Sequence, residues 1–411
     1  MPKETFRELA LLPAEKRRTL GVEHTFAEIA QQPDLWPRVL AGVEGRRREL
    51  ARFLRDARIG RDRAATVVLA GAGSSEYVGN VLTALLRQRL GCEVLSVPTT
   101  HLVTHLASTV LPDRPYLVVS FARSGDSPES VATYELVRRQ VRTARQLVIT
   151  CNRDGALARL AGADRGALCH VLPEESNDKS LAMTSSFSSM ALAGALLGFL
   201  GSWDEAARAV SMAKDRAARV VREHEAALSV FARIGFTRAC YLGADVLKGT
   251  MQEARLKMIE LTGGAVAAVF DTFLGIRHGP KVFIQGDCAV MASVSNDELV
   301  QRYEVDLLRE LKSQGQARAV IVVCERATEE IRSLADTCLE LRPPAPQTGA
   351  STGAAAPDGA GLPDLWRFLP DIVAWQILAA CKSVELGLRP DQPSPNGIIS
   401  RVVSGVTIHT R

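Results

Sequence analysis

Short apolar runs alternate with amphipathic stretches along most of this 411-residue chain. In the amino-terminal half the apolar runs lie at residues 66–70, 93–97, 116–120, 146–150 and 168–172. Continuous apolar strands separated by helices are typical of a parallel sheet that is covered by helices on both faces. The pattern therefore predicts an α/β unit, which a helix at about residues 180–200 completes.

The alternation starts again after a long polar helical stretch at about residues 204–233. Further apolar runs lie at residues 238–243, 265–270, 288–294 and 317–323. They predict a second α/β unit of similar size, so the chain contains a structural repeat. A last helix is expected at about residues 365–386.

We expect four regions in the chain. They are a helical amino-terminal segment at 1–60, an α/β domain at 61–202, a second α/β domain at 203–387 and a tail at 388–411. The helical segment contains Thr-Phe-Ala-Glu at 25–28, which resembles a capping box. Residues 343–363 are rich in Ala, Gly and Pro, and we expect them to form a flexible insert without a chemical role.

Composition agrees with an ordinary globular protein of two domains, at 46% hydrophobic and 23% charged residues. The net charge of +4 comes from 50 basic and 46 acidic residues, so nothing points to nucleic acid or an anionic membrane. The uncharged stretch at 180–203 is strongly apolar only at 190–200, too short to cross about 30 Å of hydrocarbon. We expect no secretory signal, and the eight cysteines form no C-x-x-C pair. We expect a soluble cytoplasmic protein.

Two loops follow strands of the first unit at the sheet edge where open parallel sheets bind ligands. The loop at 71–75, Gly-Ala-Gly-Ser-Ser, allows a close approach of the backbone to an anion, although Glu76 breaks the dinucleotide fingerprint. The loop at 120–127, Ser-Phe-Ala-Arg-Ser-Gly-Asp-Ser, brings three hydroxyls and a glycine to the start of a helix at Pro128. This composition favours phosphate binding without lysine or metal. The alternatives are a tight turn and a well-capped helix.

Three more features have unremarkable interpretations when each is considered alone. The hydroxyl-rich segment at 177–186 could be a helix start with ordinary caps. In the helix at 249–262, Glu253, Lys257 and Glu260 share a face by their spacing, which by pattern alone favours a solvated ion-pair face. His278 precedes Gly-Pro, and a lone loop histidine is more often at the surface than in a catalytic site.

Together these segments resemble the SIS (sugar isomerase) family. The second half is similar to the isomerase half of glucosamine-6-phosphate synthase. The nearer resemblance is to the AgaS-type group, described as galactosamine-6-phosphate deaminases or tagatose-6-phosphate ketose/aldose isomerases. The segments typical of that group lie at 25–33, 120–130, 177–190, 256–264 and 277–281. The resemblance spans nearly the whole chain and implies an α/β fold of two tandem SIS domains, each a flavodoxin-like parallel sheet flanked by helices.

The resemblance also implies catalytic roles. Glu260 matches the glutamate that moves a proton between C1 and C2 of the sugar, and Lys257 lies beside it. His278 matches the histidine that opens the sugar ring and reaches the site from a neighbouring subunit, which implies a homodimer or a higher homo-oligomer. A positioned carboxylate and an imidazole near neutrality suit these two steps.

The binding residues implied by the resemblance are hydroxyls and one arginine. The hydroxyls that match phosphate- and sugar-binding positions belong to Ser75, Ser124, Ser127, Thr184 and Ser185. Arg123 stands where the family often has glutamine and is expected to add charge to the phosphate site. The phosphate then serves as a remote anchor whose binding energy assists catalysis. No metal and no nucleotide cofactor is implied.

The expected reaction consumes an amino sugar. Residue 2 is Pro and the first cysteine is Cys92, so we expect no amino-terminal glutaminase domain that would supply ammonia. The preferred function is deaminating isomerisation of galactosamine 6-phosphate to tagatose 6-phosphate and ammonia. One alternative is a ketose/aldose phosphate isomerase without ammonia loss, and another is a non-catalytic sugar-phosphate-binding regulator. Retention of Glu260 and His278 argues against the regulator.

Overall fold

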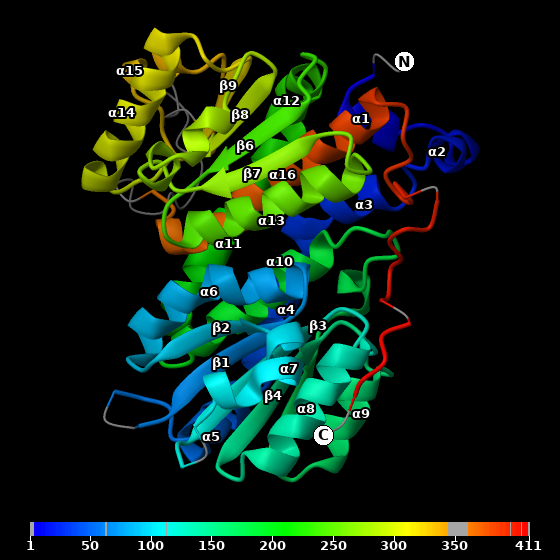
Figure 1. Ribbon diagram of the computed structural model, residues 1–411, viewed down its shortest axis with the longest axis vertical. Coiled ribbons are helices and arrows are strands. Elements are labelled where there is room, and N and C mark those ends of the chain that lie inside the picture. Colours follow the sequence, from blue (N-terminus) through cyan, green and yellow to red (C-terminus); the bar gives the residue numbers. More distant parts are fainter. Residues whose placement is uncertain are drawn as a thin grey trace, which may run out of the picture. The chain divides into compact units, whose positions relative to one another are not determined.

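The computed structural model describes residues 4–61, 64–111, 113–343, 361–394, 396–403 and 405–409. They form two compact units (Figure 1). The first unit consists of Leu12–Val210 and the residues from Gly387 onwards, and the second consists of Ser211–Leu386 and the residues up to Leu11. The predicted insert at 343–363 lies almost entirely outside the described residues.

The first unit contains a parallel sheet with strand order β2-β1-β3-β4-β5. Its strands are β1 (Thr66–Gly71), β2 (Val94–Pro98), β3 (Tyr116–Ala122), β4 (Ala144–Thr150) and β5 (Ala167–Val171). Every residue of β1 and β3 is buried, because helices cover both faces of the sheet. The strand order reverses at β1 and β3, so their carboxyl ends form the switch point at which such sheets bind ligands.

The helices of the first unit follow the predicted alternation. They are α2 (Ala14–Leu20), α3 (Thr25–Ala30), α4 (Gln32–Gly45), α5 (Arg47–Asp56), α6 (Ser74–Leu90), α7 (Thr99–Thr109), α8 (Pro128–Gln140), α9 (Ala156–Ala163) and α10 (Ser185–Leu196). The uncharged α10 is buried along its whole length and packs against α4 and α6. A helix that is apolar all round belongs in a core. No helix in the described part of the chain is both long and apolar enough to cross a membrane.

The second unit repeats the same sheet, with order β10-β9-β8-β6-β7. Its strands are β6 (Arg238–Leu242), β7 (Ala267–Asp271), β8 (Cys288–Ser293), β9 (Ala319–Cys324) and β10 (Thr337–Glu340). Its helices are α1 (Phe6–Ala10), α12 (Glu225–Ala232), α13 (Val246–Leu261), α14 (Glu298–Gln314), α15 (Glu329–Leu334) and α16 (Asp364–Glu385), and α11 (Trp203–Arg219) links the two units. The buried α16 packs against α12 and α13 (Figure 1). The predicted fold class, two parallel α/β domains in tandem, is confirmed.

The amino-terminal end of the chain belongs to the second unit, and the carboxy-terminal tail belongs to the first. Phe6 in α1 packs into the second unit, where its N–H donates to the Ser229 hydroxyl at 2.9 Å. Asp391, in the tail, belongs to the first unit and accepts hydrogen bonds from the N–H groups of Glu23, His24 and Thr25, at 2.7–3.2 Å. A carboxylate at this position caps α3, so the tail fixes the start of an amino-terminal helix.

Candidate active site

The loop between β3 and α8 forms an open cradle of hydrogen-bond donors. Gly125 has φ of 73°, a left-handed conformation that turns the loop towards the helix. Within the described part of the chain, the backbone N–H groups of Ser124, Gly125 and Ser127 have no acceptor. The side chains of both serines are partly exposed to solvent. Free N–H groups, hydroxyls and the amino-terminal end of α8 together make a site suited to an oxyanion.

Neighbouring segments hold this cradle in place. The Asn152 amide donates to the Ser124 carbonyl at 2.9 Å, and Leu157 N–H donates to the Gly125 carbonyl at 3.0 Å. The Ser127 hydroxyl donates to the Ser130 hydroxyl at 2.7 Å. The loop is therefore preorganised, and it does not have to rearrange when an anion binds.

The loop after β1 lies at the same end of the sheet, because β1 and β3 are paired neighbours. A Cβ on Gly71 would come within 2.3 Å of the Ser75 backbone, so only glycine fits there. Gly73, with φ of 58°, then starts α6. This places Ser75 in the first turn of α6, beside the loop that carries Ser124, and the structure thus brings these predicted binding residues to one edge of the sheet.

The Arg123 guanidinium is occupied by backbone carbonyls. It is 6% exposed and donates to the carbonyls of Ser180 at 3.2 Å, Leu181 at 3.0 Å and Arg401 at 2.6 Å. Arg123 thereby joins the cradle to the 180–181 segment and to the carboxy-terminal tail. Direct contact of its charge with a phosphate stays a prediction.

Thr184 and Ser185 lie at the start of α10, where both donate hydrogen bonds to Asp178. The buried Asp178 carboxylate accepts from the N–H groups of Thr184, Ser185 and Ser186 at 2.7–3.2 Å. It also accepts from the Ser185 and Ser186 hydroxyls, each at 2.5 Å. Asp178 was not recognised in the sequence, because it lies six residues before Thr184, the residue at the N-cap position of α10. A role of Thr184 and Ser185 in sugar binding stays a prediction.

Glu28 supports the same segment from α3. Its carboxylate accepts from the backbone N–H groups of Lys179 and Ser180, and from the Ser180 hydroxyl. Burial, together with the nearby charge of Asp178, raises the pKa of Glu28 to about 7. The segment before α10 thus rests on two buried carboxyl groups.

In the second unit, α13 carries a buried charged cluster. The Lys257 ammonium group lies 3.3 Å from a Glu253 carboxylate oxygen and also donates to Glu260. The side chains of Lys257 and Glu253 are fully buried, and that of Glu260 is 23% exposed. The pattern-based alternative, a solvated ion-pair face, is therefore wrong for Glu253 and Lys257. Glu253 was not among the predicted site residues, although its spacing placed it on their face.

The charge state of this cluster follows from its contacts. Burial is the largest influence on the pKa of Lys257 and lowers it, but the charges of Glu253 and Glu260 outweigh burial. The pKa of Lys257 is therefore raised, and the lysine remains an ammonium group. A fixed positive charge therefore lies beside the partly exposed carboxylate of Glu260.

His278 lies on an exposed loop of the second unit, after the turn at Gly275–Arg277. Arg277 pairs with Glu310 of α14 at 2.7 Å, and Lys281 pairs with the same carboxylate. These two ion pairs anchor the loop on both sides of the histidine. No hydrogen bond or ion pair joins the imidazole to Lys257 or Glu260 within the described part of this chain.

Comparison with known proteins shows the family of this chain. The SIS domain family matches residues 62–199. A Streptomyces coelicolor protein named AgaS is 40% identical over 94% of this chain and 95% of its own length. This chain belongs to the AgaS family of SIS-domain proteins. The predicted family is thereby confirmed.

Two further relatives extend the comparison of this AgaS-family protein. The D-galactosamine-6-phosphate deaminase AgaS of a Shewanella species is 34% identical, over 97% of this chain and 95% of its own. The crystal structure of tagatose-6-phosphate ketose/aldose isomerase from Escherichia coli is 30% identical, with a TM-score of 0.81 over 94% of this chain and 96% of that one. The likeness covers both units of the chain.

Proposed function

We propose that this protein is a deaminating aldose–ketose isomerase that converts galactosamine 6-phosphate and water to tagatose 6-phosphate and ammonia. The observation that carries the proposal is the buried Lys257 bridging Glu253 and the partly exposed Glu260. Burying two of these three charges completely is costly for stability and is typical of functional sites. The names of relatives at 34% and 40% identity support the same substrate class.

The reaction needs two proton-handling groups. His278 opens the pyranose ring by moving a proton between the ring oxygen and the C1 hydroxyl. Glu260 then removes the proton from C2 and returns it to C1, while a second proton passes from the amine nitrogen to the C1 oxygen. The aldehyde with its C2 amine thereby becomes a C2 ketimine with a C1 hydroxyl. The Lys257 ammonium lies beside the Glu260 carboxylate during this transfer.

Ammonia leaves in the last stage. Water adds to C2 of the ketimine, the carbinolamine collapses, and the C2–N bond breaks to give the ketone and ammonia. The net reaction consumes one water molecule, so the enzyme acts formally as a hydrolase. The phosphate is assigned to the cradle formed by Ser124, Gly125 and Ser127, with Ser75 beside it.

An assay with paired substrates tests this function. The protein is incubated separately with galactosamine 6-phosphate, with glucosamine 6-phosphate and with an ordinary aldose phosphate, and ammonia and ketose phosphate are measured in each reaction. We expect both products from galactosamine 6-phosphate and far less of each from its C4 epimer. Ketose formed from an ordinary aldose phosphate, with no ammonia from either amino sugar, would support the isomerase alternative. Binding without turnover would support a sugar-phosphate sensor.

Three further properties are proposed with this function. The exposed position of His278 supports its donation to the site of a neighbouring subunit, and hence a homodimer or higher homo-oligomer. A phosphorylated amino sugar, with no nucleic acid, is the proposed binding partner. A cytoplasmic location, where sugar phosphates are formed, also stays a prediction.

A further inference from the structure

The two units repeat the loops at their sheet edges as well as their strands. A Cβ on Gly71 would meet the Ser75 backbone at 2.3 Å, and one on Gly243 would meet the Leu247 backbone at 2.8 Å, four residues on in both units. Gly73 has φ and ψ of 58° and −129°, and Asp245 has 50° and −121°. The non-glycine Asp245 therefore adopts the same strained conformation as its counterpart. The turns after β1 and β6 are equivalent.

The loops after β3 and β8 are equivalent too. Ser124 is the second residue beyond β3, and Ser295 is the second residue beyond β8. Each serine hydroxyl accepts from the N–H group two residues later, from Asp126 at 3.3 Å and from Asp297 at 3.0 Å. Each loop then leads into a helix. Ser295 thus occupies in the second unit the position that Ser124 occupies in the oxyanion cradle.

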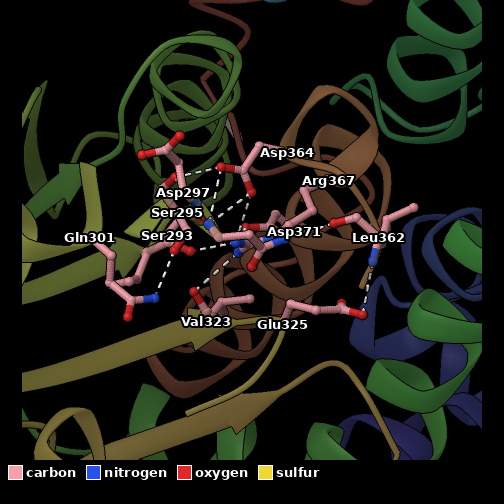
Figure 2. A network of polar contacts seen from close by, with 12 residues as sticks. Ser293, Ser295, Asp297, Gln301, Val323, Glu325, Leu362, Asp364, Arg367 and Asp371 are labelled. Carbon is pink, nitrogen blue, oxygen red and sulfur yellow. Dashed lines mark hydrogen bonds and ion pairs between the residues drawn. The ribbon is translucent and has the colours of Figure 1, made fainter. Parts of the chain in front are cut away.

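The donors of the second loop already hold an anion. The Ser295 hydroxyl donates to the Asp364 carboxylate at 2.5 Å (Figure 2). Asn296 N–H donates to both oxygens of that carboxylate, at 3.0 and 3.1 Å. Ser295 N–H donates to the buried Glu304 carboxylate at 2.7 Å. The equivalent N–H groups of the first loop have no acceptor among the described residues. The two loops therefore have similar shapes, but only the donors of the second loop already bind a carboxylate.

A buried arginine completes the resemblance of this arrangement to an oxyanion site. The Arg367 guanidinium is fully buried and lies 3.5 Å from an Asp364 oxygen (Figure 2). It is held by Asp371 at 2.8 Å and by the Val323 carbonyl at 3.2 Å, so its position is fixed. The Asp364 side chain itself is 29% exposed, which means that solvent reaches the position of its carboxylate.

We infer that the β8–α14 loop is a second oxyanion cradle, filled by the Asp364 carboxylate as a built-in anion. Each chain therefore binds one phosphate, and loss of the Asp364 carboxylate opens a second oxyanion site formed by Ser295, Asn296 and Arg367. The inference rests on the proposed function in so far as the β3–α8 cradle is taken to bind phosphate. The built-in anion also ties the start of α16 to the end of β8.

The test is the stoichiometry of inorganic phosphate binding to the full chain, measured by isothermal titration calorimetry at constant ionic strength. We expect one phosphate per chain for the unmodified protein and two for Asp364→Ala. Asp364→Asn is the matched control, because its amide oxygen still fills the cradle, and it should bind one. Adding Ser295→Ala to Asp364→Ala should return the number to one. A folded Asp364→Ala protein that binds a single phosphate would overturn the inference.

A second measurement covers the case in which Asp364→Ala is too unstable for calorimetry. A ligand that binds the folded state raises the melting temperature, so phosphate should raise that of Asp364→Ser more than that of the unmodified protein. An equal rise in both would contradict the inference. A failure of the proposed phosphate site can be distinguished from a failure of this inference. If the β3–α8 cradle does not bind phosphate, Ser124→Ala should still bind the single phosphate that the unmodified protein binds.

Discussion

The ammonium group of Lys257 lies 3.3 Å from the carboxylate of Glu253, and both side chains are completely buried. Water does not screen the attraction between these two buried charges, and either charge alone would be strongly unfavourable at this position. The buried pair therefore holds the position of Glu260, the partly exposed member of the cluster. This relationship connects the stability of α13 to the proposed chemistry.

Lys257→Met should lower the stability of the protein. The substitution keeps an unbranched side chain of similar size but removes the positive charge that faces the buried Glu253, and breaking a buried pair costs about 3–5 kcal/mol. Urea denaturation of the purified protein measures the free energy of unfolding. The double variant Glu253→Gln/Lys257→Met is the control and should recover much of the loss. Equal instability of the single and double variants would contradict this account of the pair.

Glu260→Gln should abolish turnover and leave substrate binding almost intact. The amide cannot accept the C2 proton, and loss of a positioned general base reduces the rate by about 10²–10⁴-fold. Steady-state kinetics gives kcat, and calorimetry with the substrate gives the affinity of the variant. An active Glu260→Gln protein would show that another group is the base.

Ser124→Ala should raise KM with little change in kcat. A hydrogen bond to a charged group contributes about 1.5–3 kcal/mol, which corresponds to about a 10- to 100-fold weaker affinity. Ser295→Ala, at the equivalent position of the second unit, is the matched control and should leave KM unchanged. If the two variants raise KM equally, the β3–α8 loop has no special role in phosphate binding.

Glu28 should make the stability of the protein depend on pH. Its pKa is raised from 4.5 to about 7 by burial, so the folded state binds this proton more tightly than the unfolded state does. The free energy of unfolding should therefore fall as the pH rises from about 4.5 to 7, by on the order of 2 kcal/mol for this residue. Glu28→Gln should remove that part of the slope when urea unfolding is compared at pH 5 and pH 8. Glu304, with a pKa also raised to about 7 by burial, contributes in the same direction and remains in both proteins.

The strands that lie inside the two sheets could be predicted from the sequence because they are buried on both faces and are therefore continuously apolar. The edge strand β10 was missed, because it has four residues and ends in Glu340, which pairs with Arg332. The contacts of Asp178 and Asp364 were missed for a different reason. They are made between loops and helix ends that periodicity does not place, and Asp364 meets Ser295 across 68 residues of intervening chain.

The candidate site was predictable in part. The loop composition at 120–127 indicated an oxyanion cradle, and the structure shows its N–H groups without acceptors among the described residues. The spacing of Glu253, Lys257 and Glu260 showed a shared face but not its burial. That burial depends on the packing of α13 against α16 and β7, which no local pattern reveals.

The most direct test of the central claim is the stoichiometry of products formed from galactosamine 6-phosphate. Ammonia and tagatose 6-phosphate are measured at several times in one reaction, with Glu260→Gln as the inactive control. The account predicts one ammonia for each tagatose 6-phosphate throughout the time course, and neither product from the control. Release of no ammonia by an active, folded preparation, or equal release by Glu260→Gln, would contradict it.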